Sequence, residues 1–147
     1  MAEGRSDFER LELRRVVSAS PERLFDAWTK PAELKQWWGP SGVRCIAAEV
    51  DLRVGGEYRI GNELPDKSVV WISGRFEVIE RPQLLVYTWI VDGAAEERVR
   101  VCLDRHERGT SIVITHTMMP SKKIHDRHLH GWTGCLTGLA EYLWQEE

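Results

Sequence analysis

The apolar residues of this chain fall into short segments that polar residues and turn residues separate. In one segment Val99, Val101 and Leu103 alternate with Arg98 and Arg100, which is the period of a β-strand with one buried face. The segments that fit strands are 11–17, 43–52, 57–60, 68–79, 84–91, 98–103 and 110–117. The later strands follow one another closely, so we predict antiparallel pairing, because parallel pairing needs long crossovers.

Turn residues mark the ends of these segments. The pairs Gly55-Gly56, Gly61-Asn62 and Asp92-Gly93 each follow a predicted strand. The Gly55-Gly56 pair does not precede a helix, so it is interpreted as a turn between strands and not as a phosphate-binding loop. We therefore expect a meander of strands through the middle of the chain.

Two short helices are predicted between the first and second strands. Ser20 supplies a capping side chain and Pro21 suits the first helical position, and apolar residues then recur at helical spacing up to Trp28. Pro31 restarts the chain, and a second short helix is expected to end before Gly39. Both helices come directly after the first strand.

The last segment of the chain changes to a helical period. One apolar stripe recurs at spacings of three and four and predicts a helix of about four turns: Trp132, Cys135, Leu136, Leu139, Ala140 and Leu143. Such a helix needs a partner surface, and the concave face of the sheet is the largest one available. The predicted fold class is therefore α+β, a curved antiparallel sheet wrapped around a long C-terminal helix.

Composition and charge limit the possible functions. The 147 residues fit one domain over 11–147 behind a polar leader over 1–10, and 42% of them are hydrophobic and 29% charged. A net charge of −3, with both signs interspersed, argues against a nucleic-acid partner. No apolar run approaches the ~20 residues of a membrane-spanning helix, so no membrane insertion is expected. Three dispersed cysteines favour a reduced, cytoplasmic protein, and we expect a monomer or weak dimer.

A series of motifs suggests a family. In chain order they are VSASPERLFDAWT (17–29), WWGP (37–40), DLRVGGEYR (51–59), GRF (74–76), LVYTW (85–89), GT (109–110) and HGW (130–132). The series resembles START-like (SRPBCC) domains, which include the pollen-allergen-like proteins, and within them the branch named after the activator of the heat-shock protein 90 ATPase. This resemblance implies the helix-grip fold and an internal cavity. It does not imply one activity, since relatives include carriers, polyketide cyclases and oxygenase subunits.

Two segments depart from the family pattern. The hairpin at 63–67 contains Leu64-Pro65, and the segment 118–127 before the last helix is individual to this chain. We expect both segments to rim the cavity.

Aromatic residues are the main candidates for a ligand site. The chain has seven tryptophans, which can fill a core or form the wall of a pocket. The residues that we expect to wall a cavity are Trp38, Trp71, Tyr87, Trp89, Trp132 and Leu136. Since apolar contact alone gives weak binding, Arg59, His116 or Tyr87 is expected to supply a polar anchor.

The remaining polar residues suggest little further chemistry. His125, His128 and His130 have a spacing that a metal could use, but we interpret them as part of a solvated loop and helix start. The pair Glu96-Glu97 is interpreted as solvated. No motif for a catalytic nucleophile is present, and the sequence predicts no catalytic residue, no metal and no cofactor.

Three functions remain open. The first is a carrier or sensor of a small, mostly apolar ligand. The second is a cavity enzyme of polyketide-cyclase or hydrolase type, which would need a buried ionisable pair in the cavity. The third is a protein-interaction module related to the co-chaperones, which would need a protein partner and an exposed apolar patch.

Overall fold

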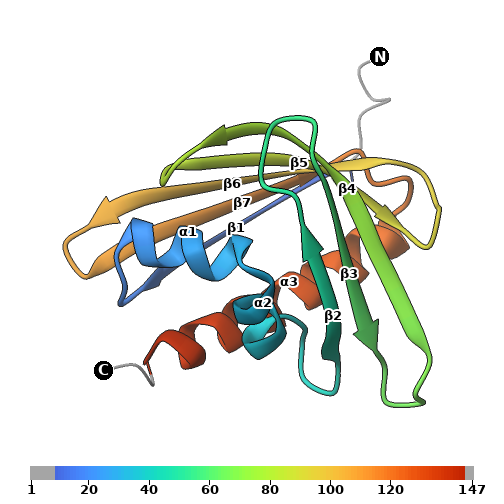
Figure 1. Ribbon diagram of the computed structural model, residues 1–147. Helices are drawn as coiled ribbons and strands as arrows, with labels where there is room; N and C mark the ends of the chain where they lie inside the picture. Colours follow the sequence, from blue (N-terminus) through green and yellow to red (C-terminus); the bar gives the residue numbers. More distant parts are fainter. Residues whose placement is uncertain (1–8, 145–147) are drawn as a thin grey trace.

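The order of strands and helices matches the prediction. The computed structural model describes residues 9–144, so most of the expected polar leader lies outside the described residues. The elements are β1 (Arg10–Val17), α1 (Pro21–Thr29), α2 (Pro31–Trp37), β2 (Arg44–Val50), β3 (Glu57–Glu63), β4 (Val69–Glu80), β5 (Leu84–Val91), β6 (Glu97–His106), β7 (Gly109–Thr117) and α3 (Lys122–Trp144). Figure 1 shows the long helix α3 running across the sheet.

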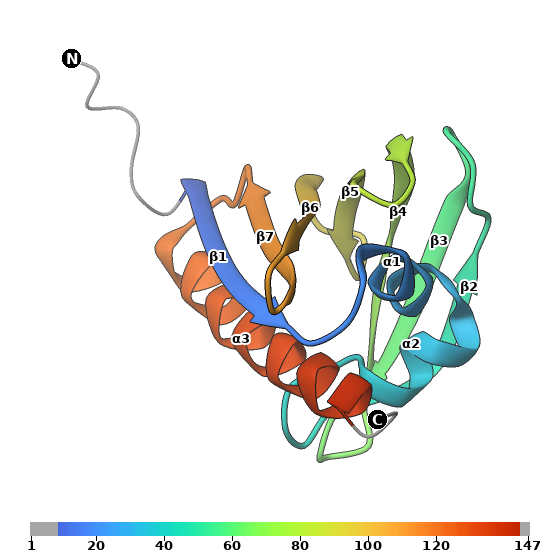
Figure 2. The ribbon, with the colours of Figure 1, turned by 90° about the vertical axis from the view of Figure 1, so that its left-hand side faces the viewer.

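The strands form one antiparallel sheet in the order β1-β7-β6-β5-β4-β3-β2. The first strand thus pairs with the last, and the remaining neighbours follow chain order as in a meander. The sheet is strongly curved and carries all three helices on its concave side (Figure 2). This is the helix-grip architecture that the motif series implies.

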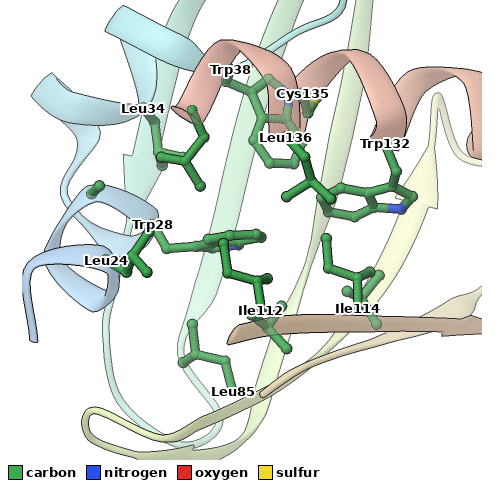
Figure 3. Packing of buried hydrophobic residues seen from close by; sticks show 14 of the residues in the cluster. Leu24, Trp28, Leu34, Trp38, Leu85, Ile112, Ile114, Trp132, Cys135 and Leu136 are labelled. Atoms are coloured by element: carbon green, nitrogen blue, oxygen red, sulfur yellow. The ribbon is translucent and has the colours of Figure 1, made fainter. Parts of the chain in front are cut away.

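The core lies between the concave face of the sheet and helix α3. In β6, Val99, Val101 and Leu103 are buried, as their alternation with arginines predicts. The apolar stripe of α3 is buried against them and their neighbours, and Figure 3 shows Trp132 and Leu136 directed from α3 toward the sheet. The buried residues that alternate along the strands and those that recur every three to four positions in the helix therefore pack into a single core.

The two short helices close one end of this core. Ser20 caps α1, since its side-chain oxygen accepts a hydrogen bond from the Arg23 backbone N–H at 3.1 Å. The indole N–H of Trp37 donates to the Ala27 carbonyl oxygen at 2.9 Å and joins α2 to α1. The chain then leaves α2 at Trp38, which is buried beneath α3.

Two sequence interpretations are corrected by the structure. Helix α3 begins at Lys122, so its 23 residues include most of the segment 118–127, which the sequence interpretation places before the helix. Gly61 and Asn62 lie inside β3 and do not form a turn. The Trp71 ring covers Gly61, where an added Cβ would lie 2.9 Å from the ring, so the glycine accommodates an aromatic neighbour on the adjacent strand.

Candidate functional site

A pocket of about 430 Å³ opens between helix α3 and strands β3, β4 and β5. Its walls are mainly apolar and include Trp38, Trp89 and Trp132. The Trp132 ring centroid lies 5.4 Å from those of both Trp38 and Trp89. Three indoles from different elements thus form a continuous aromatic wall, and the volume falls in the range of small-molecule sites.

Helix α3 contributes one face to this pocket. His128, Gly131, Trp132 and Cys135 line it, and their spacing of three and four residues places them on the same side of the helix. Gly131 leaves open space, because an added Cβ would meet no atom within 4 Å. Leu64 and Arg127 also line the pocket, so each of the two segments that depart from the family pattern reaches it.

Two buried polar atoms in the pocket walls have no hydrogen-bond partner within the described part of the chain. They are the indole nitrogen Nε1 of Trp89 and the side-chain oxygen Oδ1 of Asn62. The exposed fraction is 6% for Trp89 and 7% for Asn62. An indole N–H only donates and an amide oxygen only accepts, so two residues of the pocket lining hold one unpaired donor and one unpaired acceptor beneath its surface.

A buried cluster of ionisable side chains borders the pocket. Glu97 begins β6, His116 lies near the end of β7, and His128 belongs to α3. The Glu97 oxygen Oε1 lies 2.7 Å from His116 Nε2 and 2.9 Å from His128 Nε2. The two imidazole rings stack with centroids 4.6 Å apart. Since His128 also lines the pocket, the cluster adjoins it directly.

The hydrogen bonds determine where the protons of this cluster lie. The Trp132 indole N–H donates to His116 Nδ1 at 3.0 Å, so the neutral His116 ring carries its proton on Nε2 and donates it to Glu97. Burial lowers the pKa of His116, which favours this neutral form. Burial by itself raises the pKa of Glu97, but the hydrogen bonds from both histidines outweigh it and the net shift is downward. Glu97 is therefore a buried carboxylate held by two imidazole donors.

The sheet places the remaining predicted site residues elsewhere. Tyr87 accepts a hydrogen bond from the Trp28 indole at 3.2 Å and faces a much smaller void of about 20 Å³, and Leu136 is buried in the core. Arg59 and Trp71 stack on each other on the opposite face of the sheet, with the guanidinium carbon 3.9 Å from the ring centroid. The expectation that these two residues help to form the cavity is corrected, because neighbouring positions along a strand face opposite sides.

Of the predicted residues, the structure therefore brings Trp38, Trp89 and Trp132 together at the pocket, with His116 behind them. It also corrects the interpretations of Glu97 and His128 as solvated residues. The sequence contained a signal for Glu97, which continues the alternation of buried positions in β6 toward the start of the strand. The signal for His128 was weaker. This residue lies four positions before Trp132 and therefore on the same side of the helix.

Cys135 lies in the pocket wall, but it is a poor candidate for a nucleophile. Burial raises the pKa of its thiol to about 12, so the thiol is protonated near neutral pH. Its sulfur accepts a hydrogen bond from the Gly39 backbone N–H at 3.3 Å. The residue packs in the pocket wall and accepts this backbone hydrogen bond.

None of the helices within residues 9–144 combines the length and the hydropathy that are needed to cross a lipid bilayer.

Comparisons with known proteins agree with the fold. The family model described as activator of Hsp90 ATPase homolog 1-like protein matches residues 18–144. A protein from Chromobacterium violaceum is 27% identical with a TM-score of 0.85, and the alignment covers 91% of this chain and 96% of that protein. The AHSA1 protein from Silicibacter pomeroyi is 28% identical with a TM-score of 0.84, covering 94% of this chain and 99% of that one.

A protein from Rhodobacter sphaeroides is 26% identical with a TM-score of 0.84, and the alignment covers 98% of both chains. No curated protein sequence matches the chain. The family model spans most of the sequence and both the pocket and the cluster lie within it. The chain therefore belongs to the family of activator of Hsp90 ATPase homolog 1-like proteins.

Proposed function

We propose that the protein binds a small, mostly apolar molecule in the pocket between helix α3 and the sheet, as a carrier or sensor. The observation that carries this proposal is the pair of unpartnered polar atoms, Trp89 Nε1 and Asn62 Oδ1, in residues that line a mainly apolar pocket. Leaving a buried polar group without a partner costs about 1–3 kcal/mol. A small side-chain movement exposes both atoms to a ligand that accepts from Trp89 and donates to Asn62, and such a ligand removes this cost. A purely apolar molecule cannot do so.

The expected affinity is modest. Burying roughly 300 Å² of apolar ligand surface contributes about 7 kcal/mol at ~25 cal/mol/Å². The loss of rigid-body freedom opposes binding by at least ~4 kcal/mol. Each satisfied hydrogen bond adds about 0.5–1.5 kcal/mol, so dissociation constants of about 10 µM to several millimolar are expected. A titration therefore has to reach millimolar ligand.

The test compares 2-naphthol with naphthalene, which differ by one hydroxyl group. The protein is titrated with each compound while the indole N–H signals of its tryptophans are followed by NMR. We expect saturable shifts at Trp38, Trp89 and Trp132 and little change at Trp71, which lies on the opposite face of the sheet. We also expect 2-naphthol to bind more tightly, because its hydroxyl can pair with the pocket's polar atoms.

Two variants and one control test the polar anchors. Asn62→Leu and Trp89→Phe keep much of the side-chain volume and remove one hydrogen-bonding group each. Each variant should lower the affinity for 2-naphthol by roughly threefold to tenfold, as expected for one hydrogen bond, and change that for naphthalene much less. Trp71→Phe is the matched control. Shifts that appear only at Trp71, or none at any indole with either compound, would remove the pocket as the ligand site.

A cavity enzyme is the second candidate, because the cluster of Glu97, His116 and His128 is the buried ionisable set that such an enzyme needs. The test applies to any ligand that the titration identifies. Turnover followed by mass spectrometry should be lost in His128→Gln and retained in His130→Gln, which alters an exposed histidine of the same helix. Binding without turnover would favour the carrier.

A further inference from the structure

We propose that Glu97, His116 and His128 form a binding site for one divalent transition-metal ion, with Zn²⁺ as its representative. Each residue offers one ligand atom, and the three atoms lie within 4.8 Å of one another. Two imidazoles and one carboxylate form a donor set that zinc uses in sites with an open coordination position. This site adjoins the proposed small-molecule pocket through His128, but it does not depend on a ligand binding there.

The sheet and helix bring the three side chains together from distant parts of the sequence. His116 pairs across the sheet with Val99, and Glu97 lies two residues before Val99 on the same face of β6, so the two are diagonal neighbours. Helix α3 then adds His128 from above the sheet. Because the ligands come from rigid elements and not from loops, the donor set is preorganised.

The directions of the donor atoms converge. The Nε2 atoms of both histidines lie within hydrogen-bond distance of one carboxylate oxygen, at 2.7 Å and 2.9 Å. A tetrahedral ion with bonds of about 2.0–2.1 Å separates its ligand atoms by about 3.3 Å. Binding therefore needs an outward movement of roughly half an ångström between the carboxylate and each imidazole, which is within the range of side-chain adjustment.

Burial and charge suit a cation at this point. The side chains of His116, Glu97 and His128 are exposed by 0%, 6% and 11%, so the donors lie in a low-dielectric interior that strengthens their interaction with an ion. The pocket beside His128 provides a route from solvent. With two neutral histidines and one carboxylate, the bound ion keeps a net charge of +1 and can accept a water or an anionic group as a fourth ligand.

Binding replaces the hydrogen bonds that both Nε2 atoms donate to Glu97, and it also breaks the bond from Trp132 to His116. When His116 Nε2 ligates a metal, the proton of the neutral ring moves to Nδ1. Nδ1 then faces the Trp132 indole N–H, so two donors oppose each other and the bond at 3.0 Å is lost. The proposed site therefore has a specific signature, namely a change of the His116 tautomer coupled to the indole signal of Trp132.

The test starts from EDTA-treated full-length protein that is titrated with Zn²⁺ alone by calorimetry. We expect one equivalent to bind, and Mg²⁺, which prefers oxygen ligands, to bind at least about 100-fold more weakly. His128→Gln should weaken Zn²⁺ binding by at least about 100-fold, since even the loss of an outer-shell partner of a metal site costs 10–100-fold. His130→Gln is the matched control and should change the affinity by less than about twofold.

Two further measurements keep the test independent of folding defects. In the wild-type protein, Zn²⁺ should shift the His116 proton from Nε2 to Nδ1 in ¹⁵N spectra and move the Trp132 indole signal more than that of Trp71. Trp132→Phe removes the competing donor and should bind Zn²⁺ more tightly than the wild type. The proposal would be overturned if Zn²⁺ did not bind. It would also be overturned if His128→Gln bound Zn²⁺ as tightly as the wild type and the His116 tautomer did not change.

Discussion

Three glycines on helix α3 have very different surroundings. A Cβ at Gly134 would lie 2.6 Å from the Cβ of Pro40, and a Cβ at Gly138 would lie 2.9 Å from the Trp37 carbonyl oxygen. Both glycines therefore permit the close approach of α3 to the end of α2. Gly131 faces the pocket, and a Cβ there would meet no atom within 4 Å. The same residue type thus serves packing at two positions and leaves space for a ligand at the third.

This difference predicts opposite effects of alanine. Gly131→Ala should raise the free energy of unfolding by about 0.5–1 kcal/mol, because alanine is the better helix former and nothing obstructs its methyl group. Gly134→Ala should lower it by about 1–3 kcal/mol through overpacking against Pro40. Denaturant unfolding of both variants checks the prediction. If both variants changed the free energy of unfolding by the same amount in the same direction, helix propensity alone would explain the effect.

A larger side chain at Gly131 should occupy the pocket. We expect Gly131→Leu to reduce the affinity for 2-naphthol by at least about tenfold, since the added side chain takes the space of roughly 100 Å² of ligand contact. The NMR titration of the indole signals measures this loss, with Gly131→Ala as the control for removal of the glycine without filling of the pocket. Undiminished binding in a folded Gly131→Leu variant would place the ligand outside this pocket.

At the scale of elements, helix α1 is tied to the sheet by two ion pairs. Arg81, which follows β4, donates to Asp26 at 2.8 Å, and Arg105 of β6 donates to Glu22 at 2.6 Å. Both pairs are partly exposed, so each stabilises the fold only slightly. The burial of Leu24, Phe25 and Trp28 holds α1 on the core, and the ion pairs add a small further contribution.

The Asp26 pair predicts a pH dependence. The hydrogen bond from Arg81 holds the pKa of Asp26 below the ordinary aspartate value of 3.8. The unfolded chain therefore takes up the proton first as the pH falls, so this stabilisation is present above about pH 4 and is lost below it. Asp26→Asn should lower the free energy of unfolding by about 0.5 kcal/mol at pH 7, and by less at pH 3. If Asp26→Asn lowered the free energy of unfolding more at pH 3 than at pH 7, the ion pair with Arg81 would not be the source of the effect.

At the scale of the whole molecule, the pocket lies where helix α3 meets strands β3, β4 and β5. A molecule bound there contacts both layers of the fold and links the helix to the sheet. Ligand binding should therefore oppose every opening in which α3 leaves the sheet. The position of the pocket thus couples binding to the stability of the longest helix.

Hydrogen exchange can measure this coupling. With free 2-naphthol at 100 times its dissociation constant, the native state should be stabilised by about 2.7 kcal/mol. The slowest-exchanging amides of α3 and β5 should gain protection by a corresponding factor of about 100. The outer-edge strand β2 has little contact with the pocket and serves as the internal reference. Protection that increases only in β2 would refute the coupling.

Much of the fold could be predicted from the sequence because its signals are local. The alternation of Val99, Val101 and Leu103 shows a half-buried strand, and Ser20 with Pro21 shows a helix start. The site was only partly predictable, since its residues are distant in sequence. The side of the sheet that Trp71 faces depends on strand register, and a shift of one residue reverses it. The pair Gly61-Asn62 resembles a turn in the sequence. In the structure it lies within β3, and Gly61 is needed there because the Trp71 ring of the neighbouring strand covers it, a contact that no local pattern shows.

The element order, the alternation of buried residues in β6 and the apolar stripe of the last helix could be predicted from the sequence alone, because each follows from the period of neighbouring residues. Only the tertiary structure decided which tryptophans share a pocket, that Trp89 and Asn62 present unpartnered polar atoms there, and that Glu97 meets two histidines. The physical reason is that these contacts depend on the register and curvature of the sheet, which many residues set together.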